Sequence, residues 1–164
     1  MKRFGVLIAV ILVMSIIASI GMAEDKPWFD MKNCAFCSNM SQDLMDHLTY
    51  EQHRLSNGVM IITTFPPEYK EEFDKAMAAM QQLGMDLHSG KIDPTTIKIC
   101  GHCEYYGKMM DAGAKFEHVS TNVGEIDIIT SDNPDIQKMI MTYADNNDKA
   151  MAEMIEMGKD TKEE

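Results

Sequence analysis

The sequence is poor in basic residues, and this excludes one large class of partner. It contains 15 Lys and Arg against 26 Asp and Glu, which gives a net charge of −11 at pH 7. Proteins that bind nucleic acid need a basic stripe to neutralise phosphates, and none is present here. We therefore expect no nucleic-acid partner, and we interpret the excess of acid as a solvated surface.

Motifs that mark common enzymes are also missing. The chain has no Gly-rich phosphate loop, no nucleophile elbow and no His-Glu-x-x-His sequence. Neither cysteine pair is followed by histidine, as covalent attachment of c-type haem would require. These absences favour a binding protein over an enzyme and leave the question open.

What is present begins with a leader. Met1-Lys2-Arg3 is basic, residues 4–20 are apolar or small, and Gly21-Met22-Ala23 has the small-x-small pattern of a signal-peptidase site. This pattern predicts a signal peptide over 1–23 and export to the periplasm or the outside. The alternative is an uncleaved segment that anchors the protein in the membrane, which is the only membrane contact we expect.

The cysteines are few and regularly placed. Cys34 and Cys37 form one CxxC pair, and Cys100 and Cys103 form the other. Sliding the chain by 66 positions (100 − 34) superposes the two pairs without a gap. The same shift matches further identical residues: Glu51 with Glu117, Gly58 with Gly124, Ile62 with Ile128 and Thr64 with Thr130. This register predicts an internal duplication in one pseudo-symmetric domain: residues 24–90 with an N-terminal arm, and 91–164 with a charged tail.

Each predicted unit has the order helix, strand, strand, helix. Apolar residues follow each CxxC pair at helical spacing. Strands are expected at 49–55 and 59–64, joined by an Asn-Gly hairpin turn, and again at 115–121 and 125–130. A helix should open at Pro67 and another at Pro134, the latter broken at 146–148 and followed by a helical stretch over 150–157. Two such hairpins predict an α+β fold with one four-stranded antiparallel sheet covered by helices.

The two CxxC pairs favour a metal site. Each pair lets two sulfurs from one turn converge on an ion, and the second pair completes a tetrahedral shell. The predicted ligands are Cys34, Cys37, Cys100 and Cys103. Zinc is the expected metal, with copper(I) and an iron–sulfur centre as alternatives, and the 17 methionines favour copper slightly. The function would be metal binding, either structural or in metal handling with a protein partner in the cell envelope.

Two other functions compete with metal binding. Cys100-Gly101-His102-Cys103 resembles the tetrapeptide of protein disulfide isomerases, and a CxxC pair at a helix N-terminus has a lowered thiol pKa. This resemblance implies a thiol–disulfide oxidoreductase, but it covers four residues, and the order of elements departs from thioredoxin. In the third hypothesis, disulfides brace the halves of a ligand- or protein-binding module.

A few other residues are candidates for a site. His102 lies inside the second pair as a ligand or as a group that tunes the thiols. His53 and His118 fall on the first strand of each hairpin, one position out of register, and are expected at the surface. Glu51 and Glu117 match in the duplication and would do acid–base or metal chemistry if the pseudo-twofold brought them together; otherwise they are solvated charges.

Overall fold

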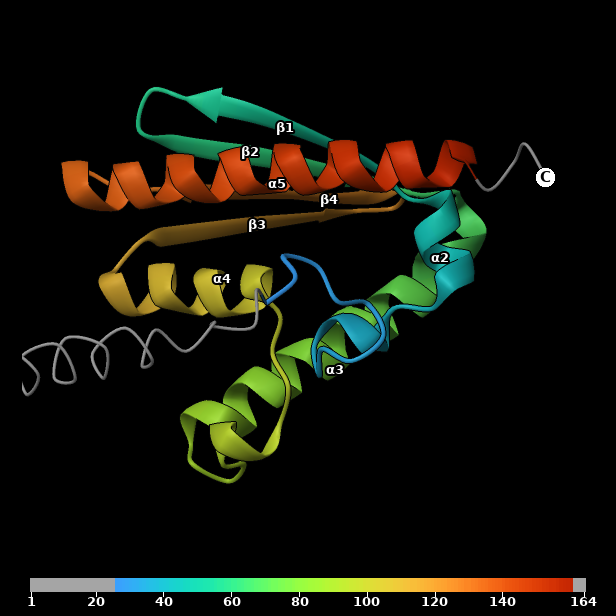
Figure 1. Cartoon of the computed structure of the whole chain (residues 1–164), viewed down its shortest axis with the longest axis horizontal. Coiled ribbons are helices and arrows are strands. Elements are labelled where there is room, and N and C mark those ends of the chain that lie inside the picture. The colour runs from blue at the N-terminus through green and yellow to red at the C-terminus, as the bar shows by residue number, and fades with distance from the viewer. Residues whose placement is uncertain (1–25, 161–164) are drawn as a thin grey trace, which may run out of the picture.

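The computed structural model describes residues 26–160, so the predicted signal peptide and the last four residues of the tail lie outside it. In chain order the elements are η1 (Cys37–Asn39), α2 (Gln42–His47), β1 (Thr49–Leu55), β2 (Gly58–Thr64), η2 (Pro67–Tyr69), α3 (Lys70–His88), η3 (Pro94–Thr96), α4 (Gly101–Ala112), β3 (Lys115–Thr121), β4 (Gly124–Thr130) and α5 (Pro134–Asp160). The predicted α+β class is confirmed (Figure 1). Within this range no helix is long and apolar enough to cross a membrane.

One antiparallel sheet joins the two hairpins in the order β1-β2-β4-β3. The central pair, β2 and β4, places Ile61 directly opposite Asp127. These residues are 66 positions apart (127 − 61), the same separation as Cys37 and Cys103. The central register is thus the one that two units related by a twofold axis would adopt, while the duplication itself stays a prediction.

Two glycines permit this central pairing. A Cβ atom added to Gly58 would lie 2.0 Å from the carbonyl oxygen of Ile129, and one added to Gly124 would lie 2.0 Å from that of Thr63. Real Cβ atoms do not approach backbone oxygens so closely, and glycine in a strand often marks a close backbone approach. The first strand position after each hairpin turn must therefore be glycine for β2 and β4 to lie together.

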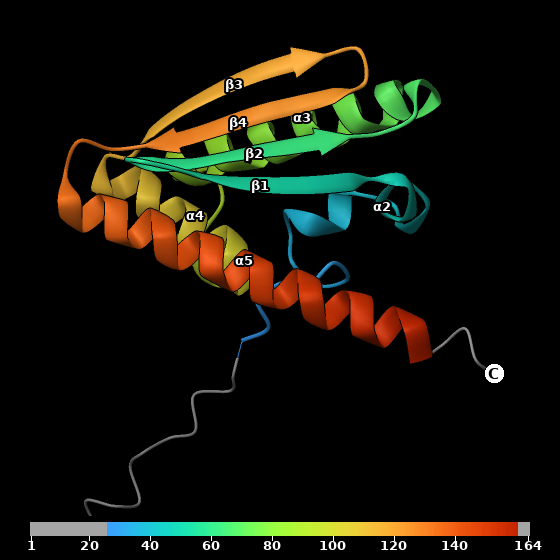
Figure 2. The same cartoon turned by 90° about the horizontal axis from the view of Figure 1, so that it is seen from above.

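Helices α4 and α5 cover one face of the sheet (Figure 2). Residues of β2 and β4 alternate between the two faces, and Val59, Ile61 and Ile129 point to the helices. The core is completed from α4 and α5 by Met109, Ile136, Ile140, Tyr143 and Ala144. Ile136, Ile140 and Tyr143 are spaced by three and four residues, so they form one buried stripe along α5.

The break predicted in the last helix is wrong, because α5 continues through Asn147. This side chain is 1% exposed and is held by partners from other elements. Its Oδ1 accepts a 2.8 Å hydrogen bond from Trp28 Nε1, and its Nδ2 donates to Tyr50 Oη and Gln52 Oε1, both at 3.2 Å. An asparagine engaged in this way does not compete for the helix backbone, which is the usual reason that it ends helices.

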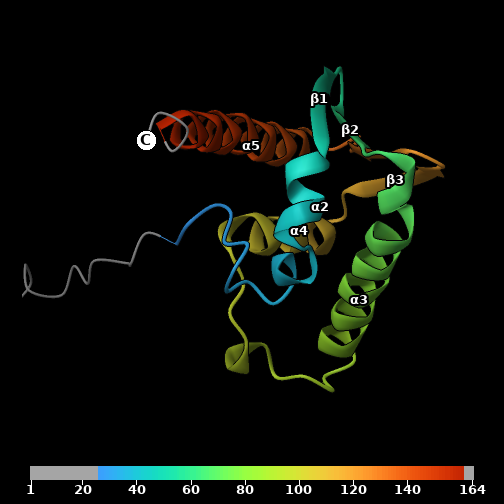
Figure 3. The same ribbon diagram turned by 90° about the vertical axis from the view of Figure 1, so that its right-hand side faces the viewer.

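The first unit differs from the second in its helices. Its predicted first helix is divided into η1 and α2, because Met40 is extended and the Ser41 side chain caps α2 by accepting a hydrogen bond from Leu44 N. Helix α3 runs from Lys70 to His88 and follows the 3-10 turn that opens at Pro67. Figure 3 shows α3 directed away from the sheet, and its first turns close a small core of Leu44, Phe65 and Phe73.

Candidate metal centre

Local backbone bonds shape each cysteine turn. Cys34 N donates to Asp30 O at 3.0 Å, and Ser38 N donates to Cys34 O at 2.9 Å, which folds the first pair into a tight loop that leads into η1. Cys100 is the N-cap of α4, and Cys103 lies in its first turn. The expectation that each pair stands at the start of a helix is confirmed for the second pair, whereas the first pair leads into the short 3-10 turn η1.

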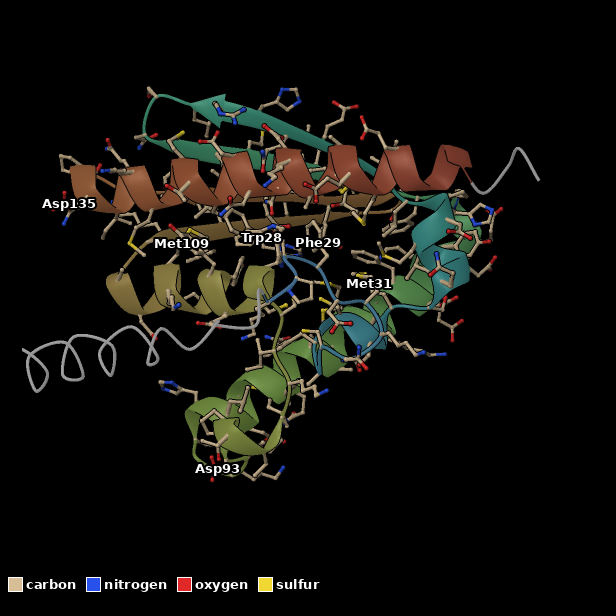
Figure 4. The ribbon with its side chains drawn as sticks, in the orientation of Figure 1. Trp28, Phe29, Met31, Asp93, Met109 and Asp135 are labelled. Atoms are coloured by element: carbon tan, nitrogen blue, oxygen red, sulfur yellow. The ribbon has the colours of Figure 1, made fainter. Side chains whose placement is uncertain are left out.

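Segments far apart in the chain hold the two turns together. Ala35 N donates to Lys98 O at 2.8 Å, which joins the first cysteine loop to the strand-like segment before α4. The N-terminal arm contributes two further bonds, because Gly101 N and His102 N, free donors at the start of α4, donate to Pro27 O and Trp28 O at 3.0 and 2.9 Å. Figure 4 shows Trp28 and Phe29 where this arm passes α4 and α5.

The four predicted cysteines converge on one point, and we call them the four-cysteine cluster. Their Sγ atoms all lie within 4.8 Å of one another. Cys37 Sγ is 3.6 Å from both Cys100 Sγ and Cys103 Sγ. Four sulfurs bound tetrahedrally to one zinc ion at about 2.3 Å stand about 3.8 Å apart. The spacing therefore fits the ligand shell of a single ion.

Burial and packing separate the four-cysteine cluster from solvent. Cys34, Cys37 and Cys100 are buried, whereas Cys103 is partly exposed. Met31 and Phe36 pack against the sulfurs, and Figure 4 shows Met31 near η1 and α3. Exclusion of water strengthens electrostatic attraction to a cation and lowers the rate at which solvent reaches it.

The arrangement does not support disulfides. All four cysteines are free, and an Sγ–Sγ separation of 3.6 Å is far longer than the bond length of about 2.05 Å. The hypothesis of disulfides that brace the two halves therefore loses its structural basis. The wholly antiparallel sheet agrees with the expectation that the resemblance to disulfide isomerases ends at the tetrapeptide and does not extend to a thioredoxin fold.

When no ion is bound, hydrogen bonds among the sulfurs determine which of the thiols ionises most readily. Hydrogen bonds from Cys103 and Cys37 hold the pKa of Cys100 far below its usual value. The same bonds to Cys100 raise the pKa of Cys37 and of Cys103, since both act as donors to it. The cluster alone therefore favours a thiolate at Cys100 and thiols at Cys37 and Cys103, and a bound cation would ionise the remaining thiols.

His102 lies beside the sulfurs and outside the converging set. Its Nε2 is 2.7 Å from Tyr143 Oη, and its Nδ1 is 3.8 Å from Cys103 Sγ. The ring is packed between Phe29 and Tyr143, with centroid distances of 4.8 and 5.1 Å. Burial lowers the pKa of His102 to about 4, so the imidazole is neutral at pH 7. This geometry suits a group that tunes the thiols better than a ligand.

Glu51 and Glu117 do not meet across the sheet. Glu51 lies on β1 and Glu117 on β3, which are the two edges of the sheet, with β2 and β4 between them. Both carboxylates are exposed. His53, also exposed, is 3.3 Å from Glu51. These residues are therefore solvated charges, as the alternative interpretation held.

Sequence reasoning missed a second group of potential ligands, His118, Glu125 and Asp127. Residues on one face of a strand recur at every second position, so Glu125 and Asp127 share a face. The β3–β4 register then places His118 opposite Asp127. The signal was available in the sequence once the turn before Gly124 had fixed that register.

The molecule is thus an α+β protein whose two halves together build a four-thiol site able to hold a transition metal ion. No protein family, curated protein or solved structure matches the chain.

Proposed function

We propose that this protein binds one transition metal ion, zinc in the first place, through the thiolates of the four-cysteine cluster, and that the ion fixes the two halves of the chain together. The convergence of four buried or half-buried Sγ atoms within 4.8 Å carries this proposal. Two ligands come from the first half of the chain and two from the second, so the ion would join the first cysteine loop to the start of α4, in addition to the bond from Ala35 N to Lys98 O.

The ligand type and spacing restrict the metal. Thiolates prefer zinc, copper(I) and iron to hard ions such as Mg²⁺ or Ca²⁺. An iron–sulfur cluster places several atoms between its cysteine ligands, so it needs sulfurs farther apart than 4.8 Å allows. A single ion fits the space, and four thiolates at tetrahedral spacing are the usual shell of structural zinc.

A filled shell favours a structural role over catalysis. Catalytic zinc keeps one position open for water or substrate, whereas four cysteines leave none. Binding of the ion would also add its free energy to folding, because an unfolded chain does not assemble the four sulfurs. We therefore propose that loss of the ion loosens the first cysteine loop from α4.

Metal handling in the cell envelope is the second candidate. The partial exposure of Cys103 favours it, because an incoming thiol on a partner protein could reach this ligand first. The basic start of the chain and the Gly21-Met22-Ala23 pattern support export, which would place such exchange outside the cytoplasm.

The first experiment measures metal and free thiols in the same purified sample under non-reducing conditions. We expect one equivalent of metal and four thiols after denaturation with a chelator. The variants Cys34→Ser and Cys100→Ser should each lose the ion, while Ser38→Ala, an exposed residue of the same loop, should keep it. Stoichiometric metal in both cysteine variants, or two disulfides and no metal in the native chain, would overturn the proposal.

A further inference from the structure

His118 is held between two carboxylates on the face of the sheet that carries α4 and α5. Its Nδ1 lies 2.9 Å from Asp127 Oδ1, the residue directly opposite on β4. Its Nε2 lies 3.5 Å from Glu125 Oε2, two positions earlier on the same strand. One atom from each of the three side chains lies within 4.8 Å of the others.

The two contacts of the ring differ in kind. The 2.9 Å contact is a hydrogen bond that fixes the orientation of the imidazole, as carboxylates do for histidines that bind metals. The 3.5 Å contact is long for a hydrogen bond. Two ligand atoms on one ion, each at about 2.1 Å, stand about 3.4 Å apart in tetrahedral geometry. Nε2 and the Glu125 carboxylate are thus spaced as ligands of a shared ion.

The burial of Glu125 is a second and independent indication of a cation site. Its side chain is 8% exposed, and among the described residues His118 is the only cationic side chain within 4.0 Å of it. A buried carboxylate is usually paired with a cation or with several hydrogen-bond donors. The carboxylates of Asp127 and of Asp74 on α3 both repel that of Glu125.

The charges at this place do not balance. Even a protonated His118 offsets one of the two carboxylates that it faces, so a negative charge remains with Asp74 nearby. Among the described residues the one cation paired with Asp74 is Lys70, a partly buried helical neighbour whose Nζ binds that carboxylate alone. A divalent cation would remove this deficit.

We propose that His118, Glu125 and Asp127 form a second metal site, which binds a divalent ion that accepts mixed imidazole and carboxylate ligands. His118 Nε2 and Glu125 supply ligand atoms, and Asp127 orients the ring and contributes the second negative charge. The mixed donors favour ions such as Mn²⁺ or Zn²⁺ over copper(I). This site shares no residue with the four-cysteine cluster, and the inference does not depend on the function proposed for that cluster.

The two sites differ in chemistry. The four-cysteine cluster surrounds an ion completely, whereas two ligating side chains, His118 and Glu125, leave positions for water. An ion at His118 would therefore exchange readily and bind more weakly. Manganese(II) is the suitable probe, because it prefers oxygen and nitrogen ligands and has little affinity for thiolates.

The test is a titration of the full-length protein with Mn²⁺, followed by the loss of the free-ion signal in electron paramagnetic resonance. We expect one specific equivalent in the native protein and binding at least tenfold weaker in His118→Gln and in Glu125→Gln. The matched control is His53→Gln, since His53 is also an exposed strand histidine beside a glutamate but lacks a second carboxylate in its group.

Two further measurements keep the result decisive. Circular dichroism melting of each variant checks that it is folded. We expect His118→Gln to fold, because it replaces a half-exposed side chain on an edge strand. The variant Cys100→Ser should keep the Mn²⁺ site, which separates this proposal from the function of the four-cysteine cluster. Mn²⁺ binding that is unchanged in His118→Gln, or weakened equally in His53→Gln, would overturn the second site, as would a native protein that binds no Mn²⁺.

Discussion

Tyr143 Oη lies 2.7 Å from His102 Nε2, and this contact joins the middle of α5 to the first turn of α4. His102 stands within the second CxxC pair, so the hydrogen bond connects the core of the protein with the four-cysteine cluster. The rings of Phe29 and Trp28 enclose the imidazole from the N-terminal arm. The position of the cluster relative to the sheet therefore depends on a side chain that does not itself converge on the metal position.

Replacement of His102 by phenylalanine tests whether this histidine is a ligand. Phenylalanine already occupies the corresponding position, Phe36, in the first CxxC pair. We expect His102→Phe and Tyr143→Phe to lower stability by about 1 to 2 kcal/mol each, because each leaves one partner of a hydrogen bond unpaired. Both should retain one equivalent of metal, as measured by elemental analysis.

A double-mutant cycle gives the strength of this contact. The double variant should lose less free energy of unfolding than the sum of the single variants, by about 1 kcal/mol. Loss of metal from His102→Phe alone, with a native circular dichroism spectrum, would show that the histidine is a ligand and does more than tune the thiols.

Metal binding should release protons. The raised pKa values of Cys37 and Cys103 keep both thiols protonated at neutral pH when no ion is present. Binding of the ion as thiolate ligands must then displace at least two protons. Since each released proton weakens affinity tenfold per unit fall in pH, affinity should drop about a hundredfold per unit between pH 8 and pH 6.

Calorimetric titrations in buffers of different ionisation enthalpy count these protons directly. A zinc-loaded sample that shows no pH dependence of affinity in this range would contradict the protonation state described for the cluster. Ser38→Ala serves as the control, because it changes the loop and leaves the sulfurs in place.

The two glycines of the central strand pair should be irreplaceable. Gly58→Ala and Gly124→Ala each place a Cβ atom 2.0 Å from a backbone oxygen of the neighbouring strand. Relief of this contact requires the strands to separate locally, and we expect a loss of about 3 kcal/mol or more in denaturant unfolding.

Gly84 provides the contrast within the same chain. It lies inside α3, and a Cβ atom there would meet nothing within 4 Å. Gly84→Ala should therefore raise stability by about 0.5 to 1 kcal/mol, because alanine is the better helix former. Equal effects at Gly84 and Gly58 would contradict the strand contact.

Replacing the buried Asn147 should lower stability far more than replacing its sequence neighbour Asn146. Asn147→Ala leaves Trp28 Nε1 without its acceptor and removes two further bonds, with an expected cost of about 2 to 3 kcal/mol. Asn146 is the preceding residue of α5 and is only half-buried, so it should tolerate alanine within about 0.5 kcal/mol. Thermal unfolding of the two variants side by side checks this difference.

Features governed by local signals could be predicted from the sequence. The Asn57-Gly58 turn and the alternation around it define the first hairpin, and the constant offset between the CxxC pairs locates the second. The convergence of Cys34 and Cys100 could be predicted because two CxxC pairs are the usual way to present four thiolates to one ion.

Features governed by tertiary partners could not be predicted. The continuity of α5 depends on Trp28 and Tyr50, which satisfy Asn147 from elements far away in sequence. Glu51 and Glu117 are far apart because β2 and β4, rather than β1 and β3, form the centre of the sheet. Either choice of central strands is compatible with two hairpins, so their order is decided by packing.

The order in which the ligands leave the ribosome has a consequence for the living cell. Cys37 and Cys103 are 66 residues apart, so an emerging chain offers two thiolates long before the other two exist. A half-built shell holds an ion loosely and yields it to any competitor. Under the proposed function, a chain retains its metal only once Cys103 has been made, and retention therefore distinguishes chains that extend into α4 from chains that end before it.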